Sequence, residues 1–83
     1  MIEAKIYITL KMTVTDPQGI TVKHALESLG YKGIEELRVG KMITLKINTS
    51  NKEIARSKLD EMCKKLLANP IIEDYSFKIN EVK

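Results

Sequence analysis

Residues 4–14 read AKIYITLKMTV, and the apolar side chains of this stretch fall mainly on its even positions. Successive side chains of a strand point to opposite faces of a sheet. The alternation therefore predicts a β-strand with one buried face. The pattern stops at Asp16-Pro17-Gln18-Gly19, where the aspartate can cap a helix and the proline suits its first turn.

Two amphipathic helices are predicted after this strand. The first follows residues 16–19 and ends near Gly30, and its apolar residues recur at helical spacing: Val22, Ala25, Leu26 and Leu29. The second begins at residues 50–53, which match a capping box with Ser50 as the cap. It ends before Pro70, and its predicted inner side carries Ala55, Leu59, Met62, Cys63 and Leu66.

Residues 34–47 allow two arrangements. Their apolar side chains lie on odd positions on both sides of Gly40. A two-residue hairpin there would put the apolar side chains of its two arms on opposite faces. The pattern favours one long strand bent at Gly40, and the alternative is two strands joined by an odd-numbered loop. A final strand is predicted over residues 71–79, interrupted only by Glu73.

The predicted order is β-α-β-α-β, or β-α-ββ-α-β if residues 34–47 turn back. Two helices on one face of a small antiparallel sheet give an α+β two-layer sandwich, related to ferredoxin-like folds. Residues 1–83 are expected to form a single domain. The other face of the sheet would be partly apolar, which favours a partner on it.

Composition narrows the classes of function. A chain of 83 residues buries little more than about 60% of its unfolded surface, so self-association is an ordinary way to gain stability. The 14 Lys and Arg and the 11 Asp and Glu are interspersed, which argues against a nucleic-acid partner. No apolar run approaches the roughly 20 residues of a membrane span, and no signal peptide is evident, so a cytoplasmic protein is expected.

The sequence predicts no catalytic or metal-binding set. His24 is the only histidine and should project about 150° away from the apolar stripe of the first helix. Cys63 is the only cysteine and lies in the apolar stripe of the second helix. Structural zinc needs four such ligands and catalytic zinc three, so no metal site is predicted.

The alternative functions are a small RNA-binding domain and a regulatory ligand-binding α+β domain. RNA-recognition motifs stack bases on aromatic side chains of a central strand. Residues 41–46 contain no aromatic side chain, and Tyr7 alone would make a poor platform. Neither alternative is favoured.

Four segments, in this order and spacing, carry a resemblance to a known family: Leu10-Lys11 with Val14-x-Asp16-Pro17-Gln18-Gly19, Ala25-Leu26-x-x-Leu29-Gly30-Tyr31, Val39-Gly40-Lys41, and Cys63-Lys64-Lys65-Leu66-Leu67-Ala68-Asn69-Pro70-x-Ile72-Glu73-x-Tyr75. The chain resembles the PurS family nearly end to end. PurS is the small subunit of phosphoribosylformylglycinamidine synthase, a ligase of de novo purine biosynthesis.

The resemblance implies a subunit that has no catalytic residue and no cofactor of its own. PurS-like chains form homodimers or homotetramers and bridge a large synthetase subunit, which uses ATP and Mg, to a glutamine amidotransferase subunit. The complex makes formylglycinamidine ribonucleotide from formylglycinamide ribonucleotide, glutamine and ATP, and ammonia passes between its active sites. Three segments of this chain are candidate contact surfaces: Asp16, Pro17, Gln18 and Gly19; Arg38, Gly40 and Lys41; and Asn69, Pro70 and Ile72.

Overall fold

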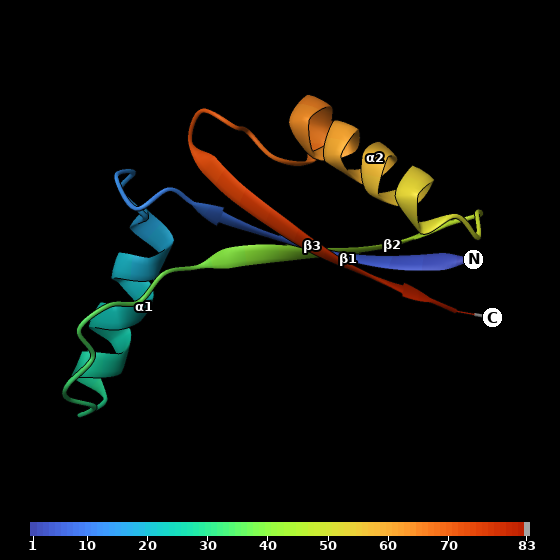
Figure 1. Ribbon diagram of the computed structural model, residues 1–83. Coiled ribbons are helices and arrows are strands. Elements are labelled where there is room, and N and C mark those ends of the chain that lie inside the picture. The colour runs from blue at the N-terminus through green and yellow to red at the C-terminus, as the bar shows by residue number, and fades with distance from the viewer. Residues whose placement is uncertain (83) are drawn as a thin grey trace.

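The structure is a computed structural model, and it describes residues 1–82. The elements follow in the order β1 (Ile2–Leu10), α1 (Pro17–Ser28), β2 (Gly40–Ile47), α2 (Lys52–Met62), η1 (Cys63–Leu67) and β3 (Glu73–Glu81). The strands form one antiparallel sheet in the order β2-β1-β3. Helix α2 lies over one face of this sheet, whereas α1 lies beyond the end where β1 stops and β2 starts (Figure 1). The α+β class and the antiparallel sheet are confirmed.

The core lies between the central strand β1 and helix α2. The side chains of Ile2, Ala4, Ile6 and Ile8 are almost completely buried, as the alternation predicts. Partly buried apolar side chains of β2 and β3 flank them, and Leu59 and Cys63 pack on them from above. Strand β1 is shorter than the apolar pattern suggests. After Leu10 the backbone turns, and the N–H of Val14 donates to the carbonyl of Lys11 at 2.9 Å.

Helix α1 does not cover the sheet, so only one of the two helices expected on that face is there. Its only buried residue is Gly19. Val22 is 41% exposed and Leu29 is 74% exposed, although both belong to the apolar stripe. The segments on either side of α1 lead the helix away from the sheet, so within residues 1–82 most of its stripe is exposed and only Leu26 is partly buried.

Neither arrangement predicted for residues 34–47 is correct. Strand β2 begins at Gly40, and residues 31–39 have no regular secondary structure. The N–H of Val39 donates to the side chain of Asp16 at 2.7 Å, so it is not available to a neighbouring strand. Within β2 the predicted apolar face is correct, because the odd-numbered residues Ile43, Leu45 and Ile47 pack against the core.

Two further differences concern α2. Its N-cap is Asn51, not Ser50, since the Asn51 side chain accepts from the N–H groups of Glu53 and Ile54 at 3.0 and 3.2 Å. After Met62 the helix widens into the π-helical turn η1, in which the N–H of Ala68 donates to the carbonyl of Cys63. The wider turn rotates Leu66 out of the predicted stripe and leaves it 83% exposed.

Candidate functional site

Asp16 is buried, with 4% of its surface exposed, at the start of α1. One carboxylate oxygen accepts from the N–H of Gly19 at 3.1 Å, which caps the helix. The other accepts from the N–H of Val39 at 2.7 Å. The bond from Val39, then that from Gly19, lowers the pKa of Asp16 below its ordinary value, because both favour the charged carboxylate.

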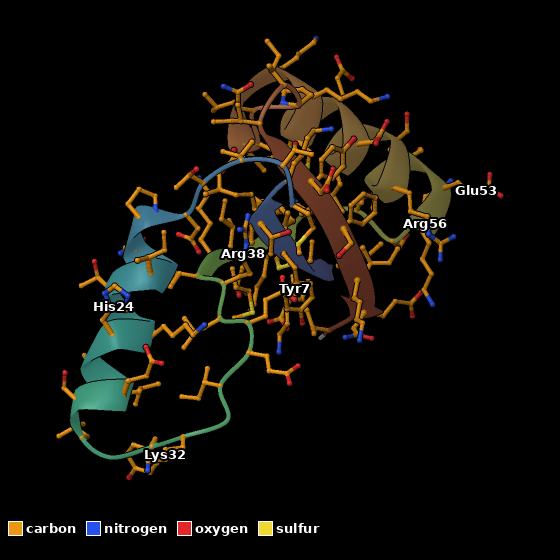
Figure 2. All side chains as sticks on the ribbon, turned by 90° about the vertical axis from the view of Figure 1, so that its left-hand side faces the viewer. Tyr7, His24, Lys32, Arg38, Glu53 and Arg56 are labelled. Atoms are coloured by element: carbon orange, nitrogen blue, oxygen red, sulfur yellow. The ribbon has the colours of Figure 1, made fainter. Side chains whose placement is uncertain are left out.

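Arg38 joins the same two parts of the chain from the other direction. Its Nη2 atom donates to the carbonyl oxygens of Lys11 and Val14, both at 2.9 Å. Both carbonyls belong to the turn between β1 and α1. In Figure 2 Arg38 lies between α1 and the sheet. Asp16 and Arg38 therefore tie the segment that enters α1 to the segment that leaves it.

The third candidate segment meets the same end of the sheet. The N–H of Lys11 donates to the carbonyl of Ile72 at 2.8 Å. The carboxylate of Glu73 accepts from the N–H of Asn69 at 2.7 Å and lies 3.8 Å from the Lys41 ammonium. We call this meeting point the junction. It contains a cavity of about 200 Å³ lined by Ile8, Leu10, Asp16, Gln18, Val39, Gly40, Lys41 and Glu73.

The structure thus brings together three segments that are far apart in the sequence. Asp16, Gly19 and Arg38 lie inside the junction and hold it together. The other predicted contact residues are exposed or largely exposed around it, and they are the ones available to a partner: Pro17, Gln18, Gly40, Lys41, Asn69, Pro70 and Ile72.

Two glycines allow the close approach of these segments. A Cβ atom on Gly19 would collide with the Asp16 carboxylate and would lie 2.7 Å from the carbonyl oxygen of Leu37. A Cβ atom on Gly40 would lie 2.8 Å from the carbonyl oxygen of Ile8. Both contacts are shorter than van der Waals packing allows, so larger residues would force the segments apart.

The lowered pKa of Asp16 makes the junction sensitive to acid. The folded pKa lies below the unfolded value of about 3.9, so the stabilising contribution is complete above that value and is lost as the pH falls through the folded pKa. We expect the protection of the Val39 and Gly19 amides against hydrogen exchange, measured relative to their intrinsic exchange rates, to fall in that acid window. In the variant Asp16→Asn the same two amides should already be less protected at neutral pH, and their protection should change little further in acid. An identical acid response in both proteins would contradict this assignment.

Two apolar surfaces lie outside the junction. The α1 face, which comprises Val22, Ala25, Leu26 and Leu29, is the stripe that the sequence assigns to the core; in the structure it is exposed except at Leu26, which is partly buried. The second surface is a groove of about 410 Å³ beside α2, lined by Leu45, Lys58, Glu61, Met62, Lys65, Leu66 and Leu67. No signal in the sequence distinguishes either surface from ordinary core positions.

The one histidine and the one cysteine lie in different elements, His24 in α1 and Cys63 at the start of η1. His24 is exposed on α1 and points to solvent (Figure 2). Cys63 is fully buried, and burial raises the pKa of its thiol, which keeps it protonated and unreactive. The Tyr75 hydroxyl donates to Asp60 at 2.7 Å and ties β3 to α2. Among residues 1–82, no three or more His, Cys, Asp and Glu side chains come together as metal ligands, and no helix is long and apolar enough to span a membrane.

Comparison with known proteins identifies the family. Residues 3–81 match the PurS family model, described as phosphoribosylformylglycinamidine (FGAM) synthase. The chain is 44% identical over 82 residues to the phosphoribosylformylglycinamidine synthase subunit PurS of Bacillus subtilis, covering 99% of this chain and 96% of that protein. It is 40% identical over 83 residues to the corresponding PurS subunit of Methanocaldococcus jannaschii, covering 100% of both.

Solved structures agree with these matches. The crystal structure of Bacillus subtilis PurS gives a TM-score of 0.87 at 43% identity and covers 98% of this chain and 100% of that chain. A chain in the structure of PurLQS from Thermotoga maritima gives a TM-score of 0.84 at 28% identity, and the match covers 96% of this chain and 99% of that chain. The chain therefore belongs to the PurS family, whose members are subunits of phosphoribosylformylglycinamidine synthase in purine biosynthesis.

Proposed function

We propose that this chain is the non-catalytic assembly subunit of a cytoplasmic phosphoribosylformylglycinamidine synthase. As a homodimer or homotetramer, it bridges the large synthetase subunit, which uses ATP and Mg, and the glutamine amidotransferase subunit. The observation that carries the proposal is the largely exposed α1 face, in a family with a member of known structure in PurLQS. An apolar helix face that is exposed in the single chain gains stability when another chain covers it.

A second copy of this chain is the proposed cover of the α1 face. A chain of 83 residues has little interior of its own, and here one of its two helices adds almost nothing to that interior. Burial of Val22 and Leu29 between two copies would supply apolar burial that the single chain lacks. Apolar area removed from water stabilises association by roughly 25 cal/mol per Å² before the cost of ordering is subtracted.

The bridging role supports ammonia transfer through geometry. The amidotransferase releases ammonia from glutamine, and the synthetase consumes it. A subunit that fixes the two active sites relative to each other raises the effective concentration of ammonia at the second. The exposed residues around the junction are the proposed contacts with the larger subunits, and no residue of this chain enters the chemistry.

Reconstitution tests the proposal. With both larger subunits present, we expect omission of this chain to lower glutamine-dependent synthesis by about a hundredfold, the lower end of the gain that linked binding sites provide. Synthesis from added ammonia is the matched control, because it needs no transfer between subunits, and it should be retained. Glutamine-dependent turnover that is unchanged without this chain would refute the proposed coupling.

A further inference from the structure

We infer that Asp16 and Arg38 are positioning residues that hold α1 at one fixed angle to the sheet and so present the α1 face to a second copy. This inference rests on the proposed function and adds the residues that set the geometry of assembly. It differs from a capping role, because it concerns the orientation of a whole helix.

The orientation of α1 is not set by helix packing. Helix α2 is held by the burial of Ala55 and Leu59, and by the bond between Tyr75 and Asp60. Helix α1 has no comparable packing on the sheet or on α2. Its main neighbour is its own following segment, where Lys23 Nζ donates to the carbonyl of Glu35 at 3.2 Å. Helix α1 and residues 31–37 therefore form a unit that projects from the sheet (Figure 1).

This unit is joined to the sheet by two connections, residues 11–16 and residues 38–39. Two parallel connections without cross-links would let the unit swing. Here three hydrogen bonds cross between them: from Val39 N–H to Asp16 at 2.7 Å, and from Arg38 to the carbonyls of Lys11 and Val14 at 2.9 Å each. All three donors lie on residues 38–39, and the acceptors are spread along the first connection at Lys11, Val14 and Asp16, so the bonds restrain rotation as well as separation.

Comparison of the two helix caps shows that Asp16 does more than cap. Asn51 caps α2 from an exposed position, and both of its side-chain bonds go to the helix itself. Asp16 is buried, and its two carboxylate oxygens accept from different segments: one from the N–H of Gly19 in α1 and the other from the N–H of Val39. A buried carboxylate is costly unless its oxygens are satisfied, and a neutral cap would serve α1 alone. The bond from Val39 is therefore the contribution of the second carboxylate oxygen of Asp16.

The test measures the distance from α1 to α2 by electron spin resonance. Spin labels are attached through His24→Cys on α1 and Arg56→Cys on α2, two exposed positions (Figure 2). The native Cys63 is buried, and a chain without the added cysteines checks that it stays unlabelled. Labelled chains are diluted with unlabelled ones, so that only distances within one chain are read.

We expect one narrow distance distribution in the parent, and broad distributions with Asp16→Asn and with Arg38→Met. Glu61→Gln is the matched control, because it makes the same kind of acid-to-amide change at an exposed ion pair with Lys65 on the same helical segment and should leave the distribution narrow. Hydrogen exchange of the β1 amides should stay slow in the two junction variants. Self-association should weaken by about tenfold, which corresponds to a modest loss of preorganisation.

Narrow distributions in both junction variants would overturn the inference, and so would broad ones that appear only together with fast exchange in β1, since that would show general unfolding. The proposed function is tested separately, by measuring glutamine-dependent synthesis in the reconstitution with the unaltered chain. The width of the distance distribution does not depend on that result.

Discussion

Replacing Leu59 by alanine should lower the free energy of unfolding by about 2–5 kcal/mol, the usual cost of a large-to-small change in a packed core. Leu59 is fully buried between α2 and the sheet, where it packs with Ile6 and Cys63. The change removes apolar contacts and leaves a cavity that the surrounding strands cannot fill. For a domain of this size the loss is a large part of the total stability.

Leu66→Ala is the matched control. The residue type is the same, the position lies seven residues further along the chain, and Leu66 is 83% exposed. Its substitution should change the free energy of unfolding by no more than about 0.5 kcal/mol. Urea unfolding at one low protomer concentration measures both variants, since self-association would otherwise add to the apparent stability. Equal losses in the two variants would mean that the π-helical turn does not direct Leu66 outward.

The contrast between these leucines shows where periodicity stops being informative. Leu59 and Leu66 are one heptad apart and share a predicted face, yet only one reaches the core. The π-helical turn η1 begins at Cys63, between these two leucines, and has no marker in the sequence. By comparison, the alternation in β1 predicted its buried face correctly, because a central strand packed on one side has only one way to place its apolar side chains.

The position of α1 could not be predicted for a different reason. An amphipathic stripe shows that a helix face needs cover, but the pattern is the same whether its own sheet or another chain provides it. The sequence assigned Val22 and Leu29 to the core on that ground. Their exposure is a property of the junction, which directs the helix away from the sheet.

The junction itself was predicted only as three separate segments. The sequence predicted the first as a helix cap, the second as a bend in a strand, which is wrong, and the third as a helix end. The bonds from Asp16 to Val39 and from Arg38 to Lys11 connect residues 23 and 27 positions apart, and the bond from Lys11 to Ile72 connects residues further apart still. Local rules describe neighbouring residues, so they gave the capping role of Asp16 without its contact with Val39.

Val22→Asp should weaken self-association by about a hundredfold or more. Val22 lies in the α1 face, where the proposed contact with a second copy would bury it. An unpaired charge taken out of water costs several kcal/mol, and each 1.4 kcal/mol corresponds to a tenfold change in the dissociation constant. The isolated chain should keep its fold, because Val22 is already 41% exposed there. Sedimentation equilibrium over a range of protomer concentrations measures the shift.

His24→Asp provides the control on the same helix. It introduces the same acidic side chain two residues away, on the side of α1 that points to solvent (Figure 2). Helix propensity and charge then change in similar ways, and only the face differs. We expect His24→Asp to associate like the parent, and the circular dichroism of both variants to match it. Unchanged association of Val22→Asp, or equal weakening by both substitutions, would remove the α1 face from the contact between copies.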